Sequence, residues 1–256
     1  MIIIVGCLFQ DCSNNNEVAP PALKTTLPKV FYCNQAHTIG LNYKRDGWTT
    51  SNVNVRIKPF TDSDIIQVLG FNEQVVFSYY NFDWVKVELK DQDEFTHGYI
   101  SSKYISSSEC NYIEYNLPEN NGFKSFMPYQ TISDKSSSQY KLQTEYAYTG
   151  NYGIRMVNNR YCVAIGTKFG LEIGTYFDLL LENGEAIKCI IADVKDDKDT
   201  DYDNIITIEN GCVCEFIVDI NHIPSDVKIN GDISYCCNEW NSSSISIKMY
   251  DKNIFN

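Results

Sequence analysis

Short runs rich in β-branched and aromatic residues recur along most of this chain, and they are what most limits its possible folds. Such runs, bounded by Gly, Asn, Asp and Ser, are typical of strands in antiparallel sheets. Asn183-Gly184 and Asn210-Gly211 are typical hairpin turns between them. The sequence therefore predicts a mainly β protein whose strands cover residues 53–57, 65–70, 74–80, 84–89, 96–100, 161–165, 176–181, 186–194, 205–208, 214–218 and 245–250.

Size and charge narrow the class of protein. The 256 residues are 43% hydrophobic and 13% aromatic, which is enough to bury one large or two small cores. The formal net charge is -12, from 21 Lys and Arg against 33 Asp and Glu. A chain this acidic offers no basic surface to a phosphate backbone. We therefore expect no nucleic-acid partner.

The ten cysteines are more than a cytosolic enzyme usually carries, and they favour an exported protein. Cys236 and Cys237 are adjacent, while Cys212 and Cys214 lie one residue apart, so neither pair identifies its own partner. No disulfide pairing follows from the sequence.

Residues 1–39 combine a short apolar run with a polar stretch that contains prolines. The run 1–9 is too short to span a bilayer and lacks the basic start of a secretory signal. Ile4-Val5-Gly6-Cys7 resembles the bacterial lipobox, which implies lipidation of Cys7. Cys12 is the rival, although Asp11 stands where a small residue is expected. We expect an extracytoplasmic envelope protein, lipid-anchored or secreted.

Residues 40–108 resemble the bacterial SH3 (SH3b) family along nearly their whole length. The resemblance implies a small SH3-like barrel that binds cell-wall peptide stems. Trp84, Tyr99 and Tyr104 are the candidate ligand-binding residues, since aromatic rings offer large contact areas at low entropic cost; core packing is the alternative role for each. The motifs that carry the resemblance are Asn52-Val53-Asn54-Val55-Arg56, Val68-Leu69-Gly70, Asp83-Trp84-Val85-Lys86-Val87 and His97-Gly98-Tyr99-Ile100-Ser101-Ser102-Lys103-Tyr104-Ile105.

Residues 109–145 are rich in Ser, Asn, Pro and Tyr and show no sustained period of 2 or 3.6 residues. We expect a linker with little regular structure. It would join the SH3-like barrel to a second β domain at 146–256.

That second region resembles the double-psi β-barrel domains of peptidoglycan-acting proteins. Its relatives in that group are the three-aspartate domain, the rare-lipoprotein-A-like barrel and the barrel of lytic transglycosylases. The resemblance implies a double-psi-like β-barrel that acts on glycan strands. It rests on Tyr161-Cys162-Val163-Ala164-Ile165-Gly166, Ile173-Gly174-Thr175, Asn183-Gly184, Ile190-Ile191-Ala192-Asp193 and Gly211-Cys212-Val213-Cys214-Glu215-Phe216.

The resemblance places Asp193 and Glu215 at the family's acidic positions over the groove of the barrel. Asp193 follows an apolar run, and desolvation would raise its pKa toward the range of a catalytic acid. A lytic transglycosylase needs one such acid, because the 6-hydroxyl of the substrate attacks and leaves a 1,6-anhydro product. Asp197 is a third candidate. The alternative role for Asp193 is to cap a turn at a strand end.

The acidic loop 196–204 has the D-x-D spacing of calcium loops. It lacks the turn glycine and the bidentate Glu of an EF-hand, so we expect no cofactor, with Ca²⁺ as the alternative. Cys162 with His222 is the pair to consider for a cysteine peptidase, but Cys162 lies in an apolar strand pattern. Trp240 is a candidate glycan contact, with a core position as its alternative.

These patterns together predict a protein that binds peptidoglycan through its SH3b domain and cleaves glycan strands with its C-terminal barrel. The alternative is a non-catalytic wall-binding or surface-interaction protein. The two differ in whether Asp193 and Glu215 converge.

Overall fold

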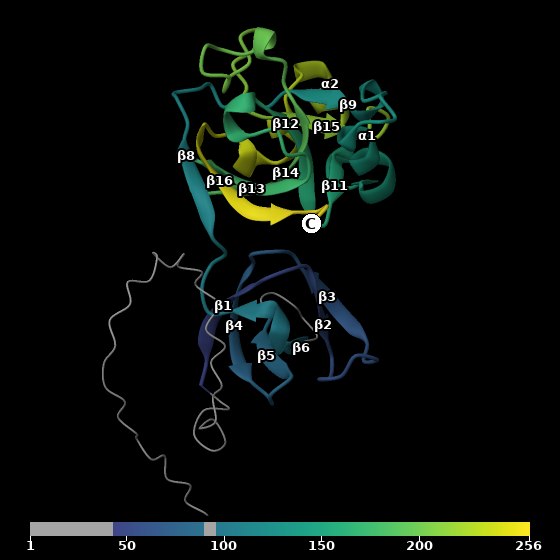
Figure 1. The fold of residues 1–256 in the computed structure, drawn as a ribbon, viewed down its shortest axis with the longest axis vertical. Helices are drawn as coiled ribbons and strands as arrows, with labels where there is room; N and C mark the ends of the chain where they lie inside the picture. Colours follow the sequence, from purple (N-terminus) through teal and green to yellow (C-terminus); the bar gives the residue numbers. More distant parts are fainter. Residues whose placement is uncertain (1–42, 90–95) are drawn as a thin grey trace, which may run out of the picture. The chain divides into compact units, whose positions relative to one another are not determined.

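The computed structural model describes residues 43–89 and 96–256. They form two β-sheets with only short helices between the strands (Figure 1). The prediction of a mainly β protein is therefore confirmed. Both sheets are open in their strand order, β3-β2-β6-β5-β4-β1-β7 and β10-β11-β12-β14-β13-β16-β8.

The first sheet has alternating burial along its strands. Val75 and Phe77 point inward from one strand and Val85 and Val87 from the next, so every second residue contributes to a small apolar core. The five strands expected between residues 53 and 100 are present. The strands of this sheet are β1 (Arg45–Thr49), β2 (Val53–Arg56), β3 (Ile65–Leu69), β4 (Gln74–Tyr79), β5 (Trp84–Glu88), β6 (His97–Ser101) and β7 (Ile105–Ser106).

The second sheet is mixed. β12 and β14 pair in parallel, as do β9 and β15, whereas the remaining ladders are antiparallel. β12 is apolar without alternation because both of its faces are covered. Its strands are β8 (Tyr112–Asn116), β9 (Phe126–Pro128), β10 (Tyr148–Thr149), β11 (Arg155–Val157), β12 (Arg160–Ile165), β13 (Thr175–Leu181), β14 (Ala186–Val194), β15 (Glu215–Val218) and β16 (Ser244–Asn253).

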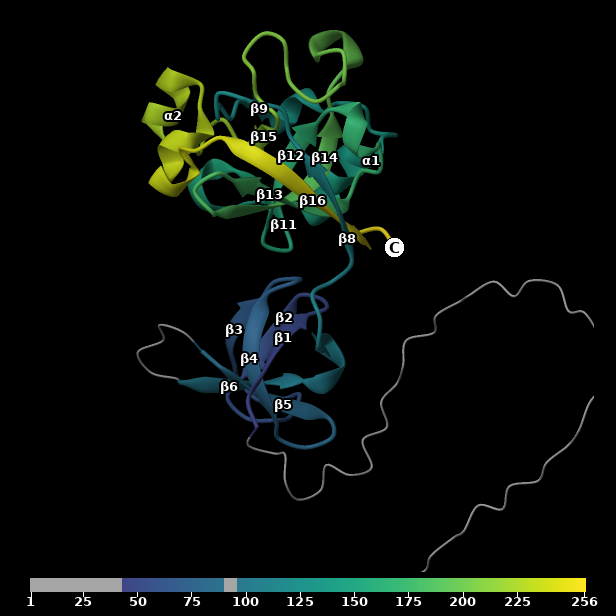
Figure 2. The same cartoon turned by 90° about the vertical axis from the view of Figure 1, so that its left-hand side faces the viewer.

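The expectation of little regular structure at 109–145 is wrong. β8 pairs along its length with β16, and the two strands lie side by side in both views (Figures 1 and 2). β9 pairs with β15. β8 is mostly exposed and β9 has only three residues, so neither shows the burial period that a sequence pattern detects. Much of this segment therefore belongs to the second sheet.

The strand expected at 205–208 is also absent. A single bridge joins Thr207 to Thr200, and the remaining residues form turns. Asp201 explains the difference, because its carboxylate accepts hydrogen bonds from the backbone N–H groups of Ile205 and Ile206 at 2.7 and 3.1 Å. Those donors are therefore not available to a neighbouring strand.

The helices are short. α1 (Ser138–Lys141) spans about one turn and α2 (Ser225–Asn230) nearly two, and a π-helical turn covers Leu142–Tyr146. Within the two described stretches, no helix has both the length and the apolar character that crossing a bilayer requires.

Phe71 joins the turn between β3 and β4 to the second core. Its side chain is 4% exposed and meets the rings of Tyr176 and Tyr250 edge-on at centroid distances of 5.5 and 5.4 Å. The guanidinium of Arg160 lies over the Phe71 ring at 5.5 Å. Next to it, Asn72 donates a hydrogen bond to the Tyr250 hydroxyl at 2.9 Å. The turn is thus held by aromatic packing and by polar contacts.

Seven cysteines fall in the described residues, and all seven are free thiols. Cys162, Cys189 and Cys214 are fully enclosed in the second core, where burial raises the pKa of Cys162 and Cys214 to about 12. They pack as small apolar side chains. The lipidation candidate Cys7 and its rival Cys12 lie outside the described residues.

Candidate functional site: two carboxyls across Ala164

A β-bulge near the end of β14 fixes the direction of Asp193. In the parallel ladder with β12, Val163 pairs with Ile191, but the next residue, Ala164, pairs with Asp193 rather than Ala192. Side chains alternate between the two faces of a strand, so one extra residue moves Asp193 onto the face that Ala192 would otherwise occupy. The bulge therefore decides which way the carboxyl points.

Ala164 also pairs with Glu215, on the other side of β12. Residues in register on neighbouring strands point to the same face of a sheet, so Asp193, Ala164 and Glu215 form a row on one face. Two strand spacings separate the outer Cα atoms, or roughly 9.5 Å. Ala164 presents only a methyl group between them. The Asp193 and Glu215 side chains therefore lie on either side of one small residue, on the same face of the sheet.

Burial governs the pKa of Asp193. Desolvation raises it, while hydrogen bonds from the backbone N–H of Val194 and from the Gln139 amide lower it. Those bonds reach Asp193 Oδ1 at 2.9 and 3.5 Å, the second being long and weak. The net direction is upward, which favours the protonated form that a general acid needs.

The pKa of Glu215 is also raised, chiefly by burial, but it has a cationic neighbour. The Lys195 ammonium and a hydrogen bond from Ser125 Oγ at 3.4 Å both lower it, whereas the Asp193 carboxylate raises it. The two carboxyls are therefore electrostatically coupled. Burial thus raises the pKa of both carboxyls, and the Lys195 ammonium limits the rise at Glu215.

Lys195 is itself held firmly in place. Its side chain is buried, and Nζ donates to Thr207 Oγ1 at 2.7 Å and to the carbonyls of Cys212 and Val213 at 3.0 and 2.9 Å. No carboxylate within residues 43–89 and 96–256 is bonded to this ammonium directly. It thus supplies a fixed positive charge near Glu215 without neutralising that side chain by contact.

The coupled pair makes a prediction about stability and pH. A raised pKa means that the folded protein holds the proton longer than the unfolded chain, so stability falls as pH rises from the unfolded pKa, about 4, through the folded pKa. Asp193→Asn and Glu215→Gln remove this cost. Urea unfolding at pH 7 is therefore expected to find both variants more stable than the parent, with the gain disappearing near pH 3.5.

The control for that measurement is Asp197→Asn, which should change stability at neither pH. Lower stability of both carboxyl variants at pH 7 would contradict the assignment of burial as the dominant influence.

Asp197 does not join the pair. It is exposed at the start of a 3-10 turn (Asp197–Asp199), and Thr167 Oγ1 donates to its carboxylate at 2.7 Å. The loop after β14 projects from the sheet in Figures 1 and 2. Asp196 accepts a hydrogen bond from the backbone N–H of Lys198 and pairs with the Lys198 ammonium. Among the described residues, no cluster of three or more His, Cys, Asp or Glu is placed to hold a metal.

Three contacts of the site were not expected from the sequence. Gln139 and Ser125 fall in the segment expected to be a linker, and they reach carboxyls 54 and 90 residues away in the chain. No local pattern marks such partners. Lys195 lies two residues after the predicted acid, but only the fold shows that its ammonium acts on Glu215.

Trp84 and Tyr104 line one open pocket of about 470 Å³ on the first sheet, together with Arg56, Asp83 and Lys103. Tyr99 is not part of its wall. Its ring packs edge-on against Tyr80 and His97 at centroid distances of 5.2 and 5.9 Å. The expected trough of three aromatic rings is thus a pocket with two.

Trp240 is 9% exposed and belongs to the second core. It stacks on Phe216 at 5.7 Å and meets Tyr161 edge-on at 5.0 Å. The structure thus places Trp240 in the core position that the sequence analysis gave as its alternative.

The cysteine peptidase alternative has no geometric support. Cys162 is enclosed in the core, whereas the His222 side chain is 66% exposed and pairs with Asp219 at 2.8 Å.

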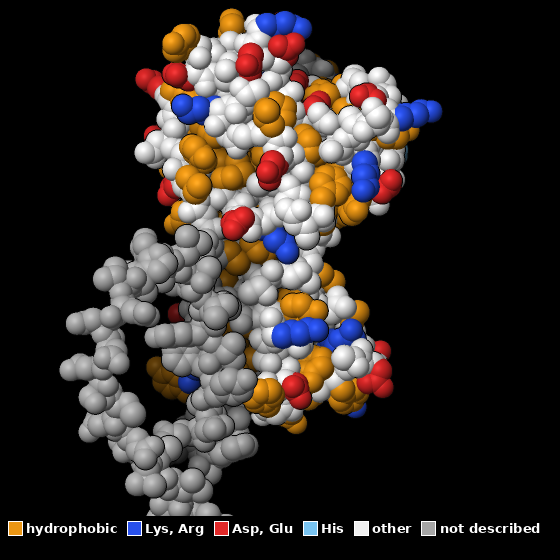
Figure 3. Space-filling view, viewed as in Figure 1, with side chains coloured by type: hydrophobic (Ala, Val, Ile, Leu, Met, Phe, Trp, Pro, Cys, Tyr) orange, Lys and Arg blue, Asp and Glu red, His pale blue; other side chains and the backbone are white. Residues whose placement is uncertain are grey.

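On the face shown in Figure 3, acidic and basic side chains are interspersed and form no single basic surface.

A scan against protein-family models, a search of curated proteins and a search of solved structures each gave no match for this chain.

Proposed function

We propose that this chain binds the bacterial cell wall and cleaves its glycan strands by acid catalysis at Asp193. The row Asp193-Ala164-Glu215 carries the proposal. In this row, burial raises the pKa of Asp193 and of Glu215, and the Lys195 ammonium lowers that of Glu215 in part. Two carboxyls with different environments are the usual means of cutting a glycosidic bond.

In the proposed reaction, protonated Asp193 donates its proton to the glycosidic oxygen as the bond to the anomeric carbon breaks. Glu215, as a carboxylate, stabilises the positive charge that develops on the sugar ring. The 6-hydroxyl of the same sugar attacks the anomeric carbon and returns its proton to Asp193. The products are a shortened strand and a 1,6-anhydro sugar, and Asp193 is protonated again.

The test is to incubate the purified protein with peptidoglycan and to search the soluble fraction for 1,6-anhydro muropeptides by mass spectrometry. Their release supports the reaction as written. Products with ordinary reducing ends would point to hydrolysis by water instead. If no fragments are released while the protein pellets with the wall, the catalytic proposal fails and the chain is a binding protein.

The pocket on the first sheet favours that second candidate, a non-catalytic wall-binding protein. Two aromatic rings and charged side chains of both signs suit a zwitterionic peptide stem. When the two roles are combined, this pocket binds the wall and the row Asp193-Ala164-Glu215 cleaves the glycan strands of the bound wall. The proposed location is the bacterial envelope, with Cys7 as the lipidated residue.

Trp84→Ala is expected to weaken pelleting with insoluble peptidoglycan by about tenfold, which is about 1.4 kcal/mol. The Trp84 ring is partly exposed in the pocket wall, so its loss removes contact area without opening the core. Tyr79→Ala is the matched control, since Tyr79 is an exposed ring of the same sheet outside this pocket. Equal wall binding by the Trp84 variant and the parent protein would exclude the pocket as the binding site.

A further inference from the structure

A second pocket is lined in part by Gln139, the residue whose amide reaches Asp193. It has a volume of about 400 Å³, and its walls come from the start of α1, from residues 171–173 and from the end of β16 with the residues after it. Gln139 belongs to this wall, and its amide also donates to Asp193 Oδ1 at 3.5 Å. One side chain therefore connects the pocket to the proposed acid.

The chemistry of the wall is mixed but mostly uncharged. Ser138, Gln139 and Asn253 offer hydroxyl and amide groups, while Leu171 and Phe255 offer apolar surface. Leu171 is 65% exposed, so its apolar side chain is accessible at the pocket wall. A sugar ring has the same two kinds of surface, hydroxyls at its edge and C–H groups on its faces.

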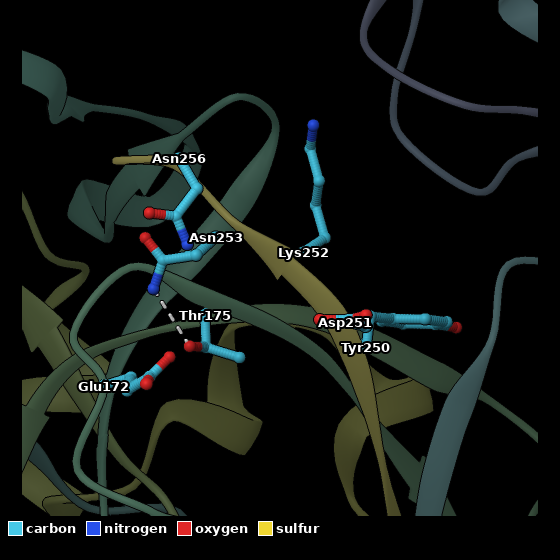
Figure 4. A pocket seen from close by; sticks show the side chains of 7 residues that line it. All are labelled: Glu172, Thr175, Tyr250, Asp251, Lys252, Asn253 and Asn256. Atoms are coloured by element: carbon cyan, nitrogen blue, oxygen red, sulfur yellow. Dashed lines mark hydrogen bonds between the residues drawn. The ribbon is translucent and has the colours of Figure 1, made fainter. Parts of the chain in front are cut away.

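Asn253 is a fixed part of this wall. Its amide donates to the carbonyl of Ile173 at 2.9 Å and to Thr175 Oγ1 at 3.1 Å, the contact drawn as a dashed line in Figure 4. Its Oδ1 accepts the backbone N–H of Phe255 at 2.9 Å. These bonds hold the strand end and the Phe255 backbone in one geometry before any ligand arrives, which lowers the entropic cost of binding.

The pocket continues into a neighbour of about 290 Å³, shown in Figure 4. Glu172 and Asn253 line both pockets, so the two share a wall. This neighbouring pocket of 290 Å³ adds Thr175, Asp251 and Lys252 to the polar lining. Two adjoining pockets suit a ligand that repeats along its length better than a single compact molecule.

We propose that these adjoining pockets are saccharide-binding subsites that hold the strand on one side of Asp193, and that Gln139 is the positioning residue between strand and acid. This inference rests on the proposed glycan cleavage for its direction. The occupant is a neutral oligosaccharide, because uncharged hydrogen-bonding groups adjoin apolar surface and the charged residues Glu172, Asp251 and Lys252 together leave a net negative lining. Its N-acetylated character follows from the proposed cleavage of wall glycan.

The test is calorimetric titration of the full chain with a soluble tetramer of N-acetylglucosamine. Leu171→Asp is expected to weaken binding at least tenfold, since it places a charge where the proposal puts a sugar face. Ile229→Asp is the matched control, because Ile229 is 81% exposed on α2 and lines neither pocket. It should bind as the parent does.

Gln139→Glu tests the positioning role. It keeps the size of the side chain but sets a carboxylate against Asp193, so the rate of strand cleavage should fall while its pH optimum shifts. Gln139→Asn, which retains the amide, should recover part of the rate at the original optimum.

The outcomes separate the two proposals. Weaker tetramer binding by Leu171→Asp alone supports the subsites, even if the parent protein cleaves nothing and the catalytic proposal fails. Cleavage by the parent with unchanged binding and cleavage in Leu171→Asp overturns the subsites and leaves the catalytic proposal standing. Failure of the parent protein to bind the tetramer also overturns them, and so does equal weakening by the Ile229 variant.

Discussion

Asp193→Asn is expected to lower the rate of glycan-strand cleavage by about 10²- to 10⁴-fold, the usual contribution of a positioned general acid. Asparagine has nearly the same shape and can still accept the Val194 N–H, so the bulge and the fold should persist. It cannot deliver a proton to the glycosidic oxygen. Circular dichroism and pelleting with the wall should therefore match the parent, while release of 1,6-anhydro muropeptides should almost disappear.

Asp197→Asn is the control for that result, because this aspartate lies on the loop after the same strand but is exposed and away from the pair. It should cleave as the parent does. If both variants lost activity equally, the acid would not be Asp193 and the loop itself would be required.

The pH profile gives an independent check on the assignment of roles. Activity should fall at high pH as Asp193 loses its proton, and at low pH as Glu215 gains one, so a bell-shaped profile is expected. Burial raises the pKa of Asp193 and extends the active range upward. Glu215→Gln should lower the rate and remove the acidic limb. The two limbs belong to the coupled pair rather than to isolated groups.

Arg160→Met is expected to destabilise the fold by about 3–5 kcal/mol, the cost of leaving one member of a buried ion pair without its partner. Arg160 is 1% exposed, and Nη1 donates to Asp178 Oδ1 and to the carbonyl of Phe177, both at 2.7 Å. Methionine keeps the apolar stem but cannot satisfy those acceptors. A loss of this size should lower the melting temperature by on the order of 10 °C.

Lys198→Met is the matched control. Lys198 and Asp196 also pair at 2.7 Å, but both side chains are exposed, where screening by water leaves such a pair with little effect on stability. Similar losses in the two variants would show that burial is not what makes the Arg160 pair important. Thermal unfolding followed by circular dichroism measures both.

The two halves of the fold differ in how far the sequence predicts them. In the first sheet, buried residues such as Val85 and Val87 alternate with more exposed neighbours, and this period of two predicts the strand from the sequence. β8 has no such alternation, because only one of its residues is partly buried. It is a strand because its backbone pairs with β16. The strand expected at 205–208 does not form, because the Asp201 carboxylate accepts the backbone N–H groups of Ile205 and Ile206.

The candidate site divides in the same way. Asp193 and Glu215 are candidates through the resemblance to double-psi barrels, and Asp193 also because it follows an apolar run. That both flank Ala164 depends on two ladders on opposite sides of β12, which no linear pattern records. The sequence assigns no disulfide pairing, and the seven described cysteines are unpaired; burial accounts for Cys162, Cys189 and Cys214.

The bulge in β14 makes this site sensitive to the number of residues as well as to their identity. Removing Ala192 would restore regular pairing with β12, leave the acid opposite Ala164 and remove only the local bend of the strand. Adding one residue before Ala192 would instead place an alanine opposite Ala164 and turn the acid to the far face. Single-residue insertions in this strand should therefore be as damaging to the site as replacing the carboxyl.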